Sequence, residues 1–218
     1  FQRMLEERDP KLYVLSLFYA LYCNYYIGYI ICLFLVLWFF VYEHKTVKRF
    51  FINGFRFAVY SLLSGGMAGF ILLPAYHGIM ATAAGDMAIP KGTWYGNIFV
   101  MLRQLLVFTK PITNQIFDGG VNLYCGMLAV LTMFLYLFVK EHPWKKFRKY
   151  VLLVLLVISF NHGTLNYIWH GMHDQYGIPN RFSFVFIFVL LVMAYDAVQS
   201  ITEIDIYFVI SSILLAGG

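Results

Sequence analysis

The stretch from residue 159 to residue 184 reads SFNHGTLNYIWHGMHDQYGIPNRFSF, and it interrupts the most apolar part of the sequence. An apolar run, 150–160, leads into it, and a longer one, 182–198, follows. Between the runs lie three of the six histidines, one acid, one cation and several amides and aromatic residues, among them His162, His170, His173, Asp174, Arg181, Asn161, Asn166, Tyr167 and Trp169. A plain interhelical loop does not need this density of polar chemistry. We interpret the stretch as a site at a membrane–water interface.

The composition indicates a polytopic membrane protein. Of 218 residues, 61% are hydrophobic and only 12% are charged, with a mean hydropathy of +0.71, whereas soluble domains carry about 25% charged residues. The positions of the charged residues along the chain are therefore more informative than the formal charge of +5. We expect no nucleic-acid partner. The cysteines, Cys23, Cys32 and Cys125, lie in apolar runs and lack the spacing of a zinc site or a disulfide framework. The chain starts without methionine and closes in an apolar run, so we expect a fragment of a longer protein.

Span lengths predict an all-α bundle, 1–218, with about seven membrane segments, because a helix needs about 20 apolar residues to cross a bilayer. The basic residues test this topology, since Lys and Arg concentrate in cytoplasmic loops. Twelve of the 16 cations fall on the inner side and four, Lys91, Arg103, Lys110 and Arg181, on the outer side. The outer face then carries the segments 77–119 and 161–181. The segments expected to cross are 12–42, 56–76, 121–139, 150–160, 182–198 and 206–218.

Residues 12–42 are too long for one straight span and too short for two full ones. We expect two shortened helices, 12–23 and 27–42, that meet in a re-entrant apex at Asn24, Tyr25 and Tyr26 on the outer side. Broken backbone is tolerated at membrane depth only inside protein or against a wet cavity. The alternative is one long tilted helix with an interfacial aromatic patch.

Two further segments have a predicted role in packing or at the interface. The small residues at 64–69 within the third span favour close helix packing. In the outer excursion, the apolar residues of 94–108 recur at helical spacing and predict an amphipathic helix in the interface: Trp94, Ile98, Met101, Leu102, Leu105 and Phe108.

The candidate site residues are polar or aromatic and belong to three outer segments. For sugar binding these are Asn24, Tyr25, Tyr26, Asn122, Tyr124, Asn161 and Trp169; for general acid–base chemistry they are Asp118, His170, His173 and Asp174. Amides bond sugar hydroxyls and aromatic rings cover sugar faces, although an interfacial aromatic belt uses the same residue types. His170-x-x-His173-Asp174 offers two imidazoles and a carboxylate to a divalent metal, but we favour hydrogen bonding and expect no metal cofactor.

Arg181 and Asp196 are the charged residues whose positions are most informative. Arg181 precedes a predicted helix, where a cation and free N–H groups bind a lipid phosphate; the alternative is an arginine that reaches the lipid headgroups without a specific ligand. Asp196 lies within a span, which marks a functional candidate, but near the cytoplasmic end, so we expect a solvated carboxylate.

Four motifs resemble those of bacterial YfhO-type membrane proteins along nearly the whole chain: NYYIGY (24–29), GVNLYCG (120–126), WHGMH (169–173) and PNRFSF (179–184). The resemblance implies a GT-C-like glycosyltransferase in the bacterial plasma membrane. Such enzymes transfer a sugar from a polyprenyl-phosphate donor to a cell-envelope polymer, such as teichoic acid, or to a glycolipid on the outer face. It further implies that the 12–42 helix pair lies under the active site and that Arg181 and His170 face the donor.

The same resemblance places the main catalytic acid in an outer loop upstream of residue 1, so this chain alone should be inactive. Two other functions remain open. A transporter or flippase of lipid-linked sugars would also use broken helices, but it needs polar groups near the midplane and on both faces. A non-catalytic scaffold predicts that changes in the outer loops have little effect.

Overall fold

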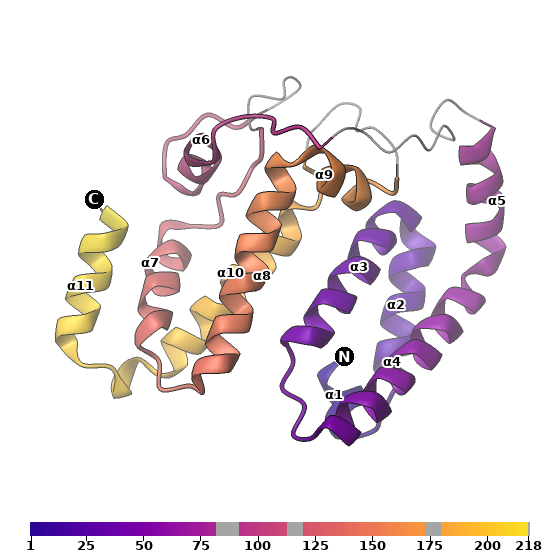
Figure 1. The fold of residues 1–218 in the computed structure, drawn as a ribbon, viewed down its shortest axis with the longest axis horizontal. Coiled ribbons are helices and arrows are strands. Elements are labelled where there is room, and N and C mark those ends of the chain that lie inside the picture. Colours follow the sequence, from indigo (N-terminus) through magenta and orange to yellow (C-terminus); the bar gives the residue numbers. More distant parts are fainter. Residues whose placement is uncertain (82–91, 113–119, 173–179, 218) are drawn as a thin grey trace. The chain divides into compact units, whose positions relative to one another are not determined.

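The computed structural model describes residues 1–81, 92–112, 120–172 and 180–217. Within these ranges the regular elements are helices, apart from one antiparallel bridge between Trp94 and His162. The all-α prediction is confirmed. The chain divides into two compact units: the N-terminal unit contains α1 to α5 and the C-terminal unit contains α6 to α11 (Figure 1).

The N-terminal unit is built on a helical hairpin. The short α1 (Gln2–Glu6) precedes α2 (Lys11–Cys23), and α3 (Tyr25–Val41) returns beside it, which confirms the predicted pair of shortened helices. Asn24 explains the break. Its backbone is extended, and its Oδ1 accepts a hydrogen bond of 3.1 Å from Ile27 N, so it is the N-cap of α3.

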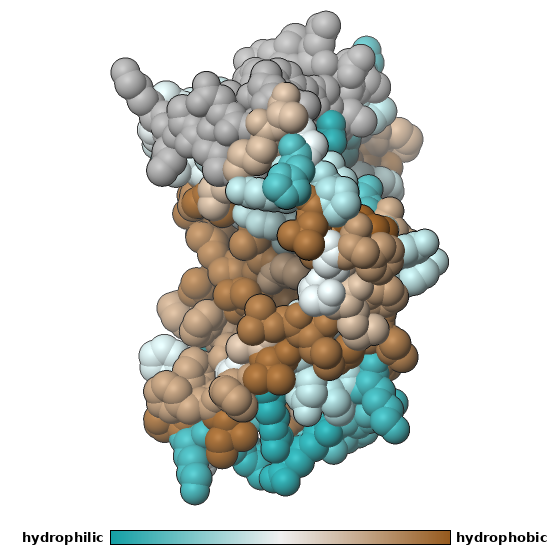
Figure 2. Space-filling model, turned by 90° about the vertical axis from the view of Figure 1, so that its right-hand side faces the viewer, coloured by the Kyte–Doolittle hydropathy of each residue, from teal (hydrophilic) through white to brown (hydrophobic). Residues whose placement is uncertain are grey.

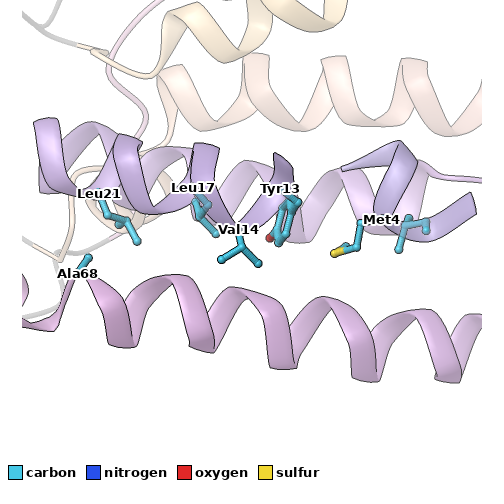
Figure 3. Packing of buried hydrophobic residues seen from close by; sticks show 7 residues of the cluster. Met4, Tyr13, Val14, Leu17, Leu21 and Ala68 are labelled. Carbon is cyan, nitrogen blue, oxygen red and sulfur yellow. The ribbon is translucent and has the colours of Figure 1, made fainter. Parts of the chain in front are cut away.

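The core of this unit lies along α2, which packs against both α3 and α4 (Val47–Met67). The cluster of buried hydrophobic side chains in this core includes Met4, Tyr13, Val14, Leu17, Leu21 and Ala68 (Figure 3). Two hydroxyl contacts fix the register of α2 on α4: Tyr13 Oη lies 2.7 Å from Ser61 Oγ, and the buried Ser64 Oγ donates to Val14 O at 3.2 Å.

The third predicted span is not one straight helix. α4 ends at Met67 and α5 (Gly69–Met80) continues after a bend of 76° at Ala68. The run of small residues packs closely at Ser64 and Ala68, which are buried in the core of the unit. The same run also contains the break, because Gly and Ser are frequent causes of sharp kinks. Around these helices the surface is hydrophobic across its middle and hydrophilic at the end where α1 and the start of α4 lie (Figure 2).

Membrane-crossing length is reached in the described residues only by the bent pair α4 and α5, judged by length and composition. Taken singly, the described helices are too short or too charged to pass the same test. The 17 residues of α3 and of α10 correspond to about 26 Å of helix, slightly less than the hydrocarbon thickness of about 30 Å.

At Gly28, α3 lies close against Leu21 of α2, and this contact gives a direct test of the hairpin. A Cβ at this position would lie 2.8 Å from Leu21 Cδ2 and 3.0 Å from Leu21 Cα. We expect Gly28→Ala to lower the free energy of unfolding by about 1–2 kcal/mol, because overpacking outweighs the better helix propensity of Ala. Equilibrium unfolding in mixed micelles of a mild detergent and SDS measures the change.

Gly65→Ala in α4 is the matched control, because an added Cβ there meets no atom within 4 Å. It should leave stability unchanged or slightly higher. Equal losses for both variants would show that the close approach of α2 and α3 does not limit the hairpin.

The C-terminal unit begins with the short α6 (Ile98–Leu102) and a 3-10 turn, η2 (Arg103–Leu105). The expected interfacial helix over 94–108 is therefore wrong in its length. Trp94 is paired with His162 in a bridge, Asn97 caps α6, and the chain leaves the helix at Leu106 and turns at 107–108. Polar contacts to the rest of the unit override the helical pattern.

The remaining helices differ from the predicted spans mainly in their bounds. α7 (Met127–Leu135) and η3 (Tyr136–Phe138) cover only the second part of 121–139, because 120–126 is not helical. α8 (Pro143–Asn161) begins before residue 150, α9 (Gly163–Trp169) lies inside the expected loop 161–181, and α10 (Ser183–Gln199) matches 182–198 closely. η4 (Ile201–Glu203) leads to α11 (Ile206–Gly217).

Candidate functional site

Helices α8 and α10 run antiparallel and give the C-terminal unit two chemically different ends. At one end Lys149 Nζ lies 2.7 Å from Asp196 Oδ2. At the other end the rings of Phe160 and Phe182 stack with centroids 4.8 Å apart. We name the first the ionic end and the second the amide end, after the side chains that dominate each.

Asn161 holds the strand-like segment 93–96 at the amide end. Its Oδ1 accepts from Gly96 N and its Nδ2 donates to Gly96 O, both at 2.8 Å. Backbone hydrogen bonds extend the attachment, from Tyr95 N to Asn161 O at 2.9 Å and from Gly163 N to Thr93 O at 2.8 Å. The amide of Asn161 is therefore buried and occupied by backbone, an arrangement that fixes a loop.

Two further asparagines tie the start of α10 to the preceding segments. Asn166 Nδ2 donates to Asn180 Oδ1, and Asn180 Nδ2 donates to Gly120 O at 2.7 Å. Both side chains are buried. Asn180 has a φ of 54°, a left-handed conformation that Asn tolerates better than most residues. These bonds set the direction in which the chain enters α10.

Aromatic rings stack at the same end of the unit as Asn166 and Asn180. The rings of Trp169 and Phe182 are stacked with centroids 4.9 Å apart, and Phe160 lies on Phe182. His170 is buried beside them; its Nδ1 is 2.7 Å from Asn166 O, and its ring meets the Phe182 ring edge-on at 5.7 Å. The structure thus places Trp169 and His170 in the interior of the unit, and their predicted roles toward sugar and proton stay predictions.

His162 was noted as one of the outer histidines but given no role. Its ring meets that of the exposed Trp94 edge-on at 5.1 Å. In the part of the chain that the structure describes, its Nδ1 has no hydrogen-bond partner. It is half-buried, so its imidazole is nearer to solvent than that of His170. The signal in the sequence was its position directly after Asn161, at the end of an apolar run.

Arg181 and Tyr124 are two exposed candidates of this unit. Arg181 lies in the turn just before α10, between the buried Asn180 and Phe182. Tyr124 belongs to an extended segment in which Val121 and Leu123 point inward. It lines a groove of about 350 Å³ together with Gln104, Leu106, Val107, Phe108, Thr109, Pro111 and Asn122.

Asn122 makes the same kind of contact as Asn161. Its Oδ1 accepts from Ile112 N and its Nδ2 donates to Ile112 O, both at 2.9 Å. It therefore fixes the end of the segment that begins at Gly96. Two of the asparagines predicted to bind sugar are, in the structure, clamps on backbone.

The remaining candidates belong to the N-terminal unit or lie outside the described residues. Asn24, Tyr25 and Tyr26 belong to the N-terminal unit, where Asn24 is a helix cap. Asp118, His173 and Asp174 lie outside the described residues. Within the residues that are described, no group of three or more His, Cys, Asp or Glu side chains has the geometry to hold a metal ion.

The sequence did not predict the ionic end: Lys149 is one of the twelve cations assigned to the inner side, and Asp196 was expected to be a solvated carboxylate. Lys149 Nζ is buried, with 4% of its side chain exposed, and contacts Asp196 and Glu141 Oε2 at 2.7 and 3.5 Å. Tyr136 Oη lies 2.8 Å from the same nitrogen and donates to Glu141. Asp196 is therefore an ion-pair partner with 30% of its side chain exposed.

Glu141 is the acid of this cluster whose titration is displaced. Burial alone would raise its pKa, but hydrogen bonds from Lys145 and Tyr136 and the charges of Lys149 and Lys145 outweigh it. The pKa of Glu141 therefore lies below its usual value. The carboxylate stays charged near neutral pH and holds the two lysines at this end.

Comparison with known proteins gives one match. A family model described as bacterial membrane protein YfhO covers residues 1–218. No curated protein and no solved structure matches the chain.

Proposed function

The chain belongs to the YfhO family of bacterial membrane proteins, and on that premise we propose that it forms part of a membrane glycosyltransferase. The enzyme transfers a sugar from a polyprenyl-phosphate donor to a cell-envelope polymer, such as teichoic acid, or to a glycolipid on the outer face of the plasma membrane. One observation supports this most. The amides, the aromatic residues and the exposed Arg181 gather at one end of the C-terminal unit, away from the lysine-rich ionic end.

In this proposal Arg181 binds the donor phosphate. It is exposed at the start of a helix of 17 residues, where the helix dipole adds positive potential to that of the guanidinium. The Asn166–Asn180–Gly120 bonds support the role, because they fix the backbone that carries Arg181. A preorganised cation stabilises the negative charge that grows on the phosphate oxygen as the glycosidic bond breaks.

The reaction is a displacement at the anomeric carbon. An acceptor hydroxyl oxygen forms the new bond to this carbon while the bond from carbon to phosphate oxygen breaks, and polyprenyl phosphate leaves with the electron pair. A general base takes the hydroxyl proton. We propose Asp118, His170, His173 and Asp174 as candidates for this proton transfer, beside the main acid expected upstream. Tyr25, Tyr26 and Tyr124 would contact the sugar.

A transporter or flippase of lipid-linked sugars is the second candidate. The 76° bend between α4 and α5 favours it, because broken helices are frequent in transporters. The two functions differ in their product: a transferase makes a new glycosidic bond, whereas a flippase only moves the donor across the bilayer.

We expect Arg181→Ala in the native full-length protein to lower sugar transfer from a polyprenyl-phosphate donor by about 100-fold or more, the range for losing one transition-state donor. Arg181→Lys should retain part of the activity, because the charge remains but the planar fork of donors is lost. Formation of the glycosylated product in membranes is the measurement, with protein amounts matched.

Lys140→Ala is the control, since it removes one exposed cation near the ionic end of the same unit. It should leave transfer unchanged. Transfer that persists in Arg181→Ala would remove the phosphate role, and donor translocation without a new glycosidic bond in the native protein would favour the flippase.

A further inference from the structure

Residues 97–111 form a segment held at both ends by the same device. Asn161 clamps Gly96 through two hydrogen bonds, and Asn122 clamps Ile112 through two more. Inside the segment, Asn97 caps α6 by accepting from Phe99 N at 2.9 Å. When the side-chain oxygen and nitrogen of an asparagine both form hydrogen bonds with the backbone of one residue, that residue is fixed in place. The segment is therefore positioned by the protein at its two ends.

The segment presents an apolar surface that the unit does not bury. Met101 is 1% exposed and points inward with Gln104 and Leu105, whereas Phe99 is 76% exposed. The exposed side of the segment consists of Phe99, Val100, Leu106, Val107 and Phe108, and we call these five residues the apolar edge. Of the stripe that the helical pattern predicted, only Phe108 belongs to this edge, whereas Met101 and Leu105 face the interior.

Phe108 is held outward by the backbone. Its φ is 64°, a left-handed conformation that is uncommon for a bulky residue. Thr109 Oγ1 donates to Leu106 O at 2.9 Å and closes the turn around it. The side chain is fully exposed at the rim of the 350 Å³ groove. A strained turn that holds a fully exposed phenylalanine outward, among other exposed apolar side chains, marks an interaction surface.

Two exposed cations flank the apolar edge. Arg103 lies between its two halves, and Lys110 follows Phe108 by two residues. Aromatic and aliphatic side chains with Arg and Lys beside them are the pattern of segments that bind at the boundary between headgroups and acyl chains. The chemistry fits a lipid surface with anionic headgroups better than a soluble protein, because the cations lie beside the apolar residues in a chain of a membrane-protein family.

We propose that the apolar edge is a lipid-inserting wedge of the C-terminal unit: Phe99, Val100, Leu106, Val107 and Phe108 enter the acyl-chain boundary while Arg103 and Lys110 contact anionic headgroups. Asn161 and Asn122 are its positioning residues. This role requires neither a sugar donor nor catalysis, so it stands independently of the glycosyltransferase.

The test measures depth in a bilayer. The native full-length protein, with its cysteines replaced by alanine, receives Phe108→Cys or Val107→Cys, a nitroxide label and reconstitution into vesicles of phosphatidylglycerol and phosphatidylcholine. Collision rates with oxygen, which partitions into lipid, and with a water-soluble nickel chelate report the depth. We expect both labels about 5–10 Å inside the headgroup boundary.

A label at Thr93→Cys is the control, because Thr93 is exposed on the neighbouring segment 93–96 and is not part of the apolar edge. It should collide with the nickel chelate. The same behaviour at 107 and 108 would place the edge in water and overturn the proposal. Protection of both labels from both relaxing agents would mean that protein covers the edge and would overturn it too.

The positioning role of Asn122 is tested separately, by the mobility and depth of the label. Asn122→Ala should increase the mobility of the nitroxide at 108 and reduce its depth, whereas Gln199→Ala, an exposed amide on α10, should change neither. An unchanged label in Asn122→Ala would remove the positioning role of this asparagine while leaving the lipid contact intact.

Discussion

Asn180→Ala is expected to lower the free energy of unfolding by about 3 kcal/mol, the sum of two separate losses. Gly120 O loses its 2.7 Å donor in a buried site, and Asn166 loses its acceptor; a buried polar group left without a partner costs about 1–3 kcal/mol. The left-handed φ of 54° costs Ala about 1 kcal/mol more than it costs Asn or Gly. Equilibrium unfolding in mixed detergent micelles measures the total.

Asn180→Gly separates the two contributions, because glycine adopts this backbone conformation freely but makes none of the side-chain bonds. It should be more stable than Asn180→Ala by about 1 kcal/mol and less stable than the native chain. If Asn180→Ala lies within about 0.5 kcal/mol of the native value, as for an ordinary surface change, the amide network does not hold α10.

Lys149→Met is expected to cost about 2–3 kcal/mol. Removing one partner of a buried ion pair costs about 3–5 kcal/mol, but solvent screens part of this because the side chains of Asp196 and Glu141 are 30% and 14% exposed. The double variant Lys149→Met/Asp196→Leu should regain most of the loss, since an apolar pair replaces the ion pair. Unfolding of the four proteins in a double-mutant cycle gives the coupling energy.

The same cluster predicts the response to acid. Because the pKa of Glu141 is lower in the folded state, its stabilisation is complete above the unfolded value of about 4.3 and is lost as pH falls through the folded pKa. Lys149→Met removes one of the cations that lower this pKa, so its acid-dependent loss should be smaller. Additive single changes in the cycle, or identical acid dependence, would contradict this account of the ionic end.

The hairpin of α2 and α3 could be predicted from the sequence because length and polarity act together there. A run of 31 apolar residues, 12–42, with Asn24 in its interior leaves few arrangements, and an asparagine is a strong helix cap. By contrast, the small residues at 64–69 permit both a packed helix and a bend, and composition does not choose between them. The 76° bend depends on the backbone at Ala68.

The sequence indicated where polar side chains gather but not which partners they bind. The density of polar residues lies at the end of α8 and the start of α10, and it stays a prediction of a site. It could not show that Asn161 and Asn122 bond backbone, because their partners Gly96 and Ile112 are 65 and 10 residues away along the chain. A hydrogen bond to a backbone group places no requirement on the partner's side chain, so the sequence of the partner segment does not reveal the contact.

Lys149 shows a signal that was present and unused. It precedes Leu152, Leu153 and Leu156, which are all buried on one face of α8. At helical spacing a residue at 149 shares that face, so its burial followed from the pattern. The count of positive charges had assigned it to the cytoplasmic loop, because such a count treats every lysine alike.

The partners of Lys149 also differ in when the ribosome makes them. Glu141 and Tyr136 precede Lys149 by 8 and 13 residues, whereas Asp196 follows it by 47. At about 5–20 residues per second, synthesis reaches Asp196 roughly 2–9 s after Lys149. The lysine therefore has a carboxylate and a hydroxyl within reach before α10 exists. The nascent chain carries this cation with its local partners, and α10 later binds to a charge that is already compensated.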